Sequence, residues 1–226
     1  MNIPILYEDN HLLIVEKPVN VPVQEDRTGD RDLLTLLKED IKVRYDKPGN
    51  VYLGLVHRLD RPVGGVMVFA KTSKAASRLA DELRRQEIGR TYLAVVRGTP
   101  SIKKDKLVHY VVKDARQNKV SVVDANQKDA KKAVLDYEVI ASSNDLSLLS
   151  VNLHTGRPHQ IRVQLAAIGC PLYGDQKYGA SVNRPGQQIA LWANSLRLTH
   201  PTKKEEITIE SLPPEVHPWD LFDAKR

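Results

Sequence analysis

The first forty residues of the chain change from a strand-like pattern of apolar residues to a helical one. Residues 11–16 form a short apolar run that Lys17-Pro18 ends, which is typical of a β-strand. After a charged loop, leucine and isoleucine recur at helical spacing within residues 33–41. This spacing predicts an amphipathic helix, with Asp30 or Asp32 as its N-cap.

The densest succession of predicted elements lies between residues 51 and 98. Thr72 or Ser73 is expected to cap a helix that ends at Gly89. A turn is expected at residues 61–65, because proline and glycine gather there. Strands are predicted at residues 52–56, 66–70 and 91–96.

The remainder of the chain is richer in strand patterns than in helices. Residues 100–132 are polar, with short alternating pieces that predict a β-meander at one edge of a sheet. Pro158 stands where a first helical residue belongs, and Gly169 is expected to end that helix. Further strands are predicted at residues 133–140, 146–153, 189–198 and 206–210. Because hairpins outnumber βαβ units, we expect an α+β fold, with helices flanking a large, mostly antiparallel mixed sheet in a single domain of residues 1–226.

Composition is typical of a soluble globular protein, with 41% hydrophobic and 27% charged residues. The lone cysteine, Cys170, excludes an intramolecular disulfide and agrees with a reducing cytoplasm. We find neither a signal peptide pattern nor the run of about 20 apolar residues that spans a membrane. We therefore expect a soluble cytoplasmic protein.

Charge indicates a polyanionic partner. The chain has 34 Lys and Arg against 28 Asp and Glu, a formal charge of +6, and this balance favours nucleic acids. Many basic proteins bind no nucleic acid, so the charge alone does not establish such a partner. Aromatic residues make up only 5% of the chain, which argues against a surface of base-stacking platforms.

The first candidate for chemistry is the charged cluster at residues 57–61, which begins with His57 and Arg58 and holds Asp60 and Arg61. It comes directly after a predicted strand, where rigid folds often present reactive groups. Turn-forming aspartates are common, however, and position alone favours Asp60 as a turn residue and Arg58 as a surface charge.

The second candidate is the segment of residues 157–162. If a helix begins at Pro158, His159 and Arg162 lie one turn apart on the same face, near a helix N-terminus that attracts anions. The competing interpretation is an ordinary amphipathic helix with Arg162 in solvent, and physics alone favours it.

The third candidate is the basic segment of residues 84–92. Its arginines would suit a phosphate backbone, or they would complement the dipole of a helix end. The arginines are Arg84, Arg85 and Arg90. Tyr92 begins an apolar strand, and from this position it is expected in the core.

Several other classes of site are not supported by the sequence. The histidines, among them His109, His154 and His200, are too scattered for a zinc spacing, and one cysteine supplies no thiolate set. There is no glycine-rich phosphate loop of the common types and no Gly-x-Ser-x-Gly elbow. No metal or cofactor is therefore expected.

Taken together, these segments resemble the RluA-type family of pseudouridine synthases. Residues 57–68 (His-Arg-Leu-Asp-Arg-x-x-Gly-Gly-Val-Met-Val) look like the motif that holds its invariant aspartate. Residues 90–98 look like the motif with its active-site tyrosine, and residues 156–165 like the motif with its basic residue. Lys17-Pro18 and the run 171–179 also fall where the family has similar runs. The resemblance covers roughly residues 5–212.

The resemblance has departures. The family commonly has Thr-Ser-Gly where this chain has Val63-Gly64-Gly65, and the lost hydroxyls are expected to alter turn hydrogen bonding or substrate preference. Val19-Asn20 replaces the frequent glycine after Lys-Pro. We expect no accessory N-terminal RNA-binding domain, because the resemblance begins almost at residue 1.

The resemblance implies a pseudouridine synthase fold with a central active-site cleft, and a cofactor-free isomerase that converts uridine to pseudouridine in ribosomal or transfer RNA. It implies Asp60, Tyr92 and Arg162 as catalytic residues, with Arg162 beside Asp60. The expected RNA contacts are His57, Arg58, Arg61, Arg84, Arg85, Arg90, His159 and Gln160. We expect a monomer that takes a uridine from a loop or a single strand.

Two alternatives belong to other classes. One is a catalytically silent RNA-binding or ribosome-assembly factor on the same scaffold, against which the retention of Asp60, Tyr92 and Arg162 weighs. The other is a metal-dependent nuclease or hydrolase that uses the histidines with Asp60.

Overall fold

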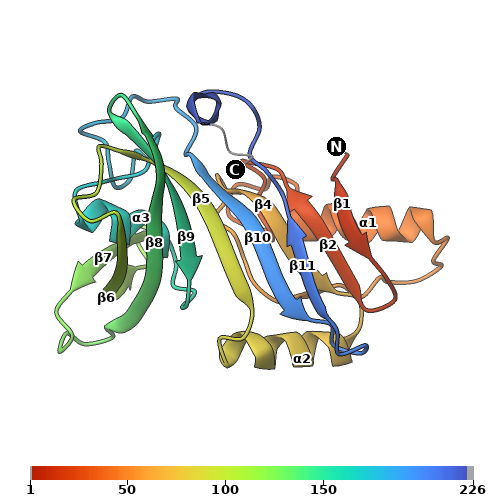
Figure 1. The fold of residues 1–226 in the computed structure, drawn as a ribbon. Coiled ribbons are helices and arrows are strands. Elements are labelled where there is room, and N and C mark those ends of the chain that lie inside the picture. Colours follow the sequence, from red (N-terminus) through yellow and green to blue (C-terminus); the bar gives the residue numbers. More distant parts are fainter. Residues whose placement is uncertain (1, 223–226) are drawn as a thin grey trace. The chain divides into compact units, whose positions relative to one another are not determined.

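The computed structural model describes residues 2–222, which divide into two compact units (Figure 1). The first unit comprises Met1–Ile88 and Ala193–Ser211, and the second comprises Gly89–Trp192 and Leu212–Arg226. The described residues form eleven strands and three α-helices. All strand pairs with an assigned register are antiparallel. The predicted α+β fold with mostly antiparallel strands is therefore confirmed.

The first unit is a sheet in the order β1-β2-β4-β10, with β11 paired to β10 and β3 to β4. Its elements are β1 (Ile5–Glu8), β2 (Leu12–Lys17), α1 (Leu33–Arg44), β3 (Gly54–Leu55), β4 (Gly64–Ala70), α2 (Ser73–Arg84), β10 (Leu191–Thr199) and β11 (Glu206–Glu210). Of the predicted caps, Asp32 accepts from the Thr35 amide in α1, and Thr72 accepts from the Ala75 amide in α2. Capping oxygens satisfy amides that the first helical turn leaves unpaired.

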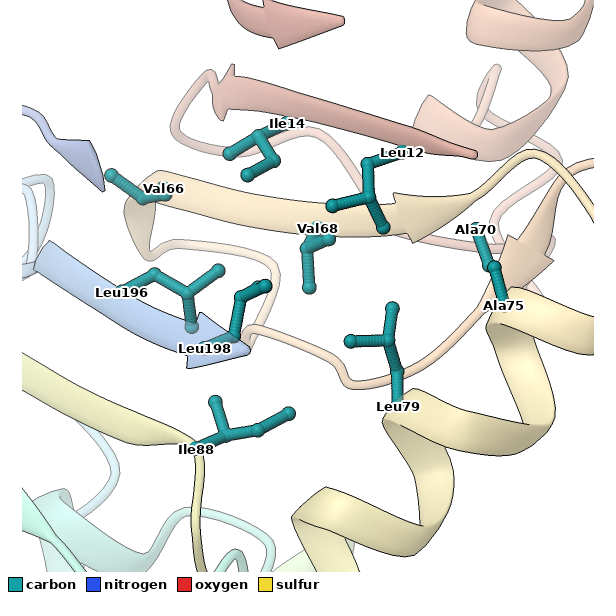
Figure 2. Close-up of a cluster of buried hydrophobic side chains, with 10 residues drawn as sticks. All are labelled: Leu12, Ile14, Val66, Val68, Ala70, Ala75, Leu79, Ile88, Leu196 and Leu198. Atoms are coloured by element: carbon teal, nitrogen blue, oxygen red, sulfur yellow. The ribbon is translucent and has the colours of Figure 1, made fainter. Parts of the chain in front are cut away.

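The core of the first unit lies between α2 and the sheet (Figure 2). Ala75 and Leu79 of α2 point toward Val68 and Ala70 of β4, and all four are at most 2% exposed. Burying each large aliphatic side chain contributes about 1.5–3 kcal/mol. The cluster consists of Leu12, Ile14, Val66, Val68, Ala70, Ala75, Leu79, Ile88, Leu196 and Leu198.

The strand predicted at residues 52–56 is wrong in length, because β3 contains only Gly54 and Leu55. These residues pair with Ala70 and Phe69 of β4. Further along β4, the Val68 amide donates to the ring Nε2 of His57 at 3.1 Å. A side chain thus takes the place of a backbone partner, and the ladder stops.

The second unit has its strands in the order β5-β9-β8-β6-β7. Its elements are β5 (Gly89–Arg97), β6 (Lys104–Asp114), β7 (Lys119–Val123), β8 (Lys131–Ser143), β9 (Leu146–Leu153), α3 (Gln160–Ala167) and a short 3-10 helix (Trp219–Leu221). The meander predicted within residues 100–132 is wrong in topology: β6 and β7 form an antiparallel hairpin at the edge of the sheet, and the next strand, β8, pairs with β6 and not with β7. The hairpin predicted around residues 133–153 is confirmed as β8–β9.

The start of the third helix differs from the prediction. It begins at Gln160 and not at Pro158, because His159 adopts a left-handed conformation with φ 51°. The side chain of Gln160 accepts from the Thr155 hydroxyl at 2.7 Å and from the Arg157 amide at 3.0 Å, which fixes the approach to the helix. Gly169, with φ 80°, lies just past the end of the helix, as predicted.

The hydrogen-bonded carboxylate of Asp9 in the first unit generates a prediction about acid stability. Asp9 accepts from the amides of His11 and Leu12 at 2.7 and 2.8 Å and contacts Nε2 of the fully buried His200 at 2.7 Å. Nδ1 of His200 accepts from the amides of Thr202 and Lys203, so Nε2 carries the proton. Burial raises the pKa of Asp9, but these donors more than offset it and hold the pKa at about 2.

We therefore predict that Asp9→Asn lowers the free energy of unfolding by about 1–2 kcal/mol at pH 7. Because the pKa of the folded state lies below that of an unfolded aspartate, the contribution is present above about pH 4 and is lost toward pH 2. Urea unfolding at several pH values measures the difference, with Glu25→Gln at an exposed position as the control. A difference between wild type and Asp9→Asn that stays constant from pH 6 to pH 2.5 would contradict the assignment.

Candidate active site

The loop that carries Asp60 belongs to the first unit. Asp60 is half-buried, and its carbonyl accepts from the Val63 amide at 2.9 Å, which closes the turn. Gly65 follows with φ 113°, and a Cβ there would lie 2.2 Å from the carbonyl oxygen of Ala193. Only glycine fits this position. The predicted turn is therefore confirmed, and its last residue has no room for a side chain.

The Asp60 loop is held in place by Lys17, which is fully buried. Its Nζ donates to the carbonyls of Pro18, Arg61 and Val63 at 2.9, 3.0 and 2.7 Å. Burial lowers the pKa of Lys17 to about 7, while the negative charge of Asp60 acts in the opposite direction. From the sequence, Lys17 was predicted to end a strand and, with Pro18, to match a run of the family, but not to hold the Asp60 loop. The only sign of this role in the sequence is a Lys-Pro pair directly after an apolar strand.

The other charged residues of this cluster lie at the surface of the first unit. Arg58 is exposed. Arg61 forms ion pairs with Asp30 and, at 3.6 Å, with Asp26, and its Nη1 donates to the Thr28 hydroxyl at 2.9 Å. Arg61 therefore holds the charged loop of residues 20–30 in this structure.

The basic residues that follow α2 fall into two groups. Arg84 pairs with Asp81, and Arg85 pairs with Asp81 and Glu87; both arginines are exposed in the first unit. Arg90 lies on β5 of the second unit and is only 9% exposed. Proximity in sequence therefore does not give these three arginines a common environment.

Tyr92 and Arg90 lie two residues apart on β5, so their side chains share one face of the strand. Tyr92 is 6% exposed, which agrees with its predicted core position. The pairing of Tyr92 with Val151 of β9 holds its backbone in register.

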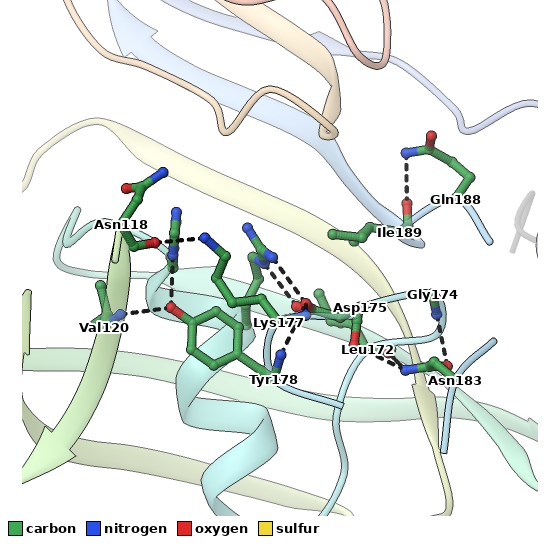
Figure 3. Close-up of polar contacts among 12 residues, drawn as sticks. Asn118, Val120, Leu172, Gly174, Asp175, Lys177, Tyr178, Asn183, Gln188 and Ile189 are labelled. Atoms are coloured by element: carbon green, nitrogen blue, oxygen red, sulfur yellow. Dashed lines mark hydrogen bonds and ion pairs between the residues drawn. The ribbon is translucent and has the colours of Figure 1, made fainter. Parts of the chain in front are cut away.

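Arg162 is also buried, and the interpretation that placed it in solvent is wrong. Its Nε and Nη2 donate to the two carboxylate oxygens of Asp175 at 2.8 and 2.9 Å, with 7% and 0% of the two side chains exposed (Figure 3). Asp175 also accepts from the amides of Lys177 and Tyr178. Burial raises the pKa of Asp175, but Arg162 and these amides hold it below its usual value.

Tyr178 connects this pair to the start of α3 and to β7 (Figure 3). Its hydroxyl accepts from the Val120 amide at 2.9 Å and lies 2.7 Å from Nδ1 of His159. The guanidinium of Arg162 lies 5.2 Å from the centre of its ring. The expectation that His159 and Arg162 share a helix face required a helix from Pro158, which is wrong, but both side chains contact Tyr178.

The predicted site residues are thus divided between the two units. His57, Arg58, Asp60 and Arg61 lie in the first unit, whereas Tyr92, His159, Gln160 and Arg162 lie in the second. Lys17, Asp175 and Tyr178 were not predicted as site residues, although Asp175 and Tyr178 lie in the run 171–179 that resembles a run of the family. Across residues 2–222, no three His, Cys, Asp or Glu side chains come together as ligands of a metal ion. In the same range no helix has the length and apolar character needed to cross a membrane.

Comparison with known proteins identifies a family. A family model described as RNA pseudouridylate synthase matches residues 11–167. The chain is 36% identical over 211 residues to an uncharacterised RNA pseudouridine synthase, YhcT, of Bacillus subtilis, covering 92% of this chain and 67% of that protein. It is 33% identical over 217 residues to ribosomal large subunit pseudouridine synthase C of Buchnera aphidicola, covering 91% and 65%. The chain thus spans about two thirds of the length of these relatives.

Solved structures show the same fold. Human RNA pseudouridylate synthase domain containing 4 matches with a TM-score of 0.79 at 24% identity, covering 93% of this chain and 88% of that one. Human RNA pseudouridylate synthase domain containing 1 matches with a TM-score of 0.75 at 23% identity, covering 95% and 85%. The fold expected from the resemblance is therefore confirmed.

We predict that Asp175→Asn lowers the free energy of unfolding by about 3 kcal/mol, because it removes the carboxylate that accepts two hydrogen bonds from the buried Arg162 guanidinium. Urea unfolding of a double-mutant cycle with Arg162→Met measures the coupling between the two side chains. The double variant should lose less stability than the sum of the single variants. Additive losses would show that the pair contributes no coupling energy.

Proposed function

The chain belongs to the RNA pseudouridylate synthase family, and on this premise we propose that it isomerises specific uridines of a structured RNA to pseudouridine. The observation that carries the proposal is the continuous family match of residues 11–167, which contains Asp60, Tyr92 and Arg162. The similar proteins are named as synthases, which argues against a catalytically silent binding factor.

The reaction is an internal rearrangement. The N1–C1′ bond breaks, the base turns, and C5 bonds to C1′; the C5 proton leaves and N1 acquires a proton, so the product is an isomer of the substrate. The uridine must first leave the stack, which costs only a few kcal/mol in a loop or single strand.

Asp60 is the essential carboxylate of this proposal. It acts in the ionised form, whether as nucleophile at the sugar, as base at C2′, or as stabiliser of the separated base and glycal. Arg162 is the proposed neighbour, because a positive charge beside a carboxylate favours its ionised form. Two observations support the arrangement: the Asp60 loop is held by the buried ammonium of Lys17, and the Arg162 side chain is immobilised by Asp175.

Tyr92 is proposed to stack against the target base and to assist removal of the C5 proton. Its support is a buried position on a strand that pairs with β9 from Thr91 to Arg97. Phenols have a pKa near 10 and are therefore mostly protonated at neutral pH, which makes stacking the less demanding of the two roles.

The proposed substrate is ribosomal RNA, with transfer RNA as the alternative. The names of similar proteins refer to the large ribosomal subunit, and the formal charge of +6 suits a phosphate backbone. Arg58, Arg61, Arg84, Arg85 and His159 are proposed contacts. The protein is proposed to act as a monomer in the cytoplasm, and its single cysteine agrees with a reducing compartment.

Replacement of the carboxylate tests the proposal. In cells that lack this protein, wild type should restore pseudouridine at defined positions, and Asp60→Ala should lower the modification by roughly 10²-fold or more while the protein still accumulates. Mapping pseudouridines in total RNA measures this, with Asp124→Ala on an exposed turn as the control. Equal modification by wild type and Asp60→Ala would refute the role of Asp60. An RNA map that does not change when the protein is absent would refute the function.

The role of Tyr92 is tested by Tyr92→Phe, which keeps the ring and removes the hydroxyl. RNA affinity should stay near that of wild type, because stacking is retained. The final proton step should slow by about 10²-fold or more, because general base catalysis contributes about that much. Release of tritium from RNA labelled at C5 measures the step. A rate equal to that of wild type would exclude the hydroxyl from proton transfer.

A further inference from the structure

Arg90 is a buried cation without a counter-charge. It is 9% exposed, and in the part of the chain that the structure describes it forms no ion pair. Its Nη2 donates to the carbonyl of Leu153 over a long 3.4 Å, and its Nε is buried without a hydrogen-bond partner. Burial lowers the pKa of Arg90, yet a guanidinium keeps its proton at neutral pH. Buried charges in proteins are nearly always paired, so this arrangement needs an explanation.

The guanidinium lies against Gly156, an exposed residue. A Cβ at this position would lie 3.0 Å from Nη1 and 3.9 Å from Cζ of Arg90. At this point the cation is covered by a residue that has no side chain. A negatively charged group that rests on Gly156 would therefore be within reach of Nη1.

The position of Arg90 relative to Tyr92 restricts the chemical identity of this negatively charged group. The two residues are separated by one residue on β5, so their Cα atoms are about 6.6 Å apart and their side chains share a face. This spacing is comparable to the span from a base to its own phosphate in a nucleotide. Arg84 and Arg85 differ from Arg90, because both are exposed and already have acidic partners.

We propose that Arg90 binds a backbone phosphate of the substrate RNA next to the target uridine, through Nη1 beside the exposed Gly156. The inference rests on the proposed function, in which Tyr92 contacts the base. The phosphate supplies the counter-charge that the protein lacks, and arginine is the residue best suited to phosphate oxygens. The buried cation is then explained as half of an ion pair that RNA completes.

Three variants separate the parts of this inference. Arg90→Met removes the charge, and Arg90→Lys keeps the charge without the planar fork. Gly156→Ala keeps Arg90 but adds a methyl group 3.0 Å from its Nη1, which crowds the guanidinium and covers it at the surface. Arg197→Met serves as the control, because Arg197 is exposed, pairs with Glu206 and lies outside the proposed site.

The probe is a synthetic RNA stem–loop that carries a uridine mapped as described above, with either a full phosphate backbone or one uncharged methylphosphonate beside that uridine. Binding by the full-length protein is measured over a range of salt concentrations. The methylphosphonate should weaken wild-type binding about tenfold and have no further effect on Arg90→Met. The slope of log K against log salt should fall by about one in Arg90→Met. Gly156→Ala should weaken binding, whereas Arg90→Lys should retain part of the affinity.

The outcomes are distinguishable. If Arg90→Met loses stability but still responds to the methylphosphonate like wild type, Arg90 is structural and the inference is overturned. An unchanged salt slope overturns it as well. Failure of the proposed function appears separately, as wild-type protein that forms no pseudouridine in the unmodified stem–loop.

Discussion

A charged ammonium cannot remain fully buried unless oxygen atoms surround it, and this constraint shapes the loop that carries Asp60. Lys17 satisfies its three protons with the carbonyls of Pro18, Arg61 and Val63. Two of these carbonyls belong to the turn that Asp60 opens. The conformation of the turn is therefore tied to the end of strand β2, which is itself in register with β4 from Leu12 to Lys17.

The second unit contains two buried guanidinium groups in opposite situations. Arg162 is complete within the protein, because Asp175 matches it with two oxygens and is in turn held by backbone amides. Arg90 has only a long hydrogen bond to a carbonyl. The protein thus holds one arginine rigidly and keeps the other available for an external anion, and both follow from the same cost of burying charge.

The elements with strong periodicity were predictable, because apolar spacing alone decides them. The helices α1 and α2 with their N-caps, and the hairpin β8–β9, were found from the sequence in this way. The predicted end of α2 at Gly89 is wrong: the helix ends at Arg84, and Gln86 adopts a left-handed φ of 62°. The start of α3 was not, because the left-handed backbone of His159 leaves no signal in a pattern of apolar residues. The shortness of β3 was missed for a similar reason, since the ring of His57 replaces a backbone partner.

The site was predictable only in part. Motif resemblance singled out Asp60, Tyr92 and Arg162, but not the residues that hold them. Lys17 precedes Asp60 by more than forty positions, and a contact at such a separation is decided by the folded chain. The burial of Arg90 was equally hidden, because its neighbours Arg84 and Arg85 in the sequence are exposed.

The closeness of Gly65 to Ala193 has a consequence for how this turn tolerates variation. A backbone that passes 2.2 Å from the place of a Cβ accepts no side chain, so the last residue of the Val63-Gly64-Gly65 segment must stay glycine. The difference from the usual Thr-Ser-Gly of the family falls entirely on the two residues before it. Valine and threonine have nearly the same shape, so at residue 63 a methyl group takes the place of a hydroxyl. The backbone carbonyl of Val63 still accepts a hydrogen bond from Lys17.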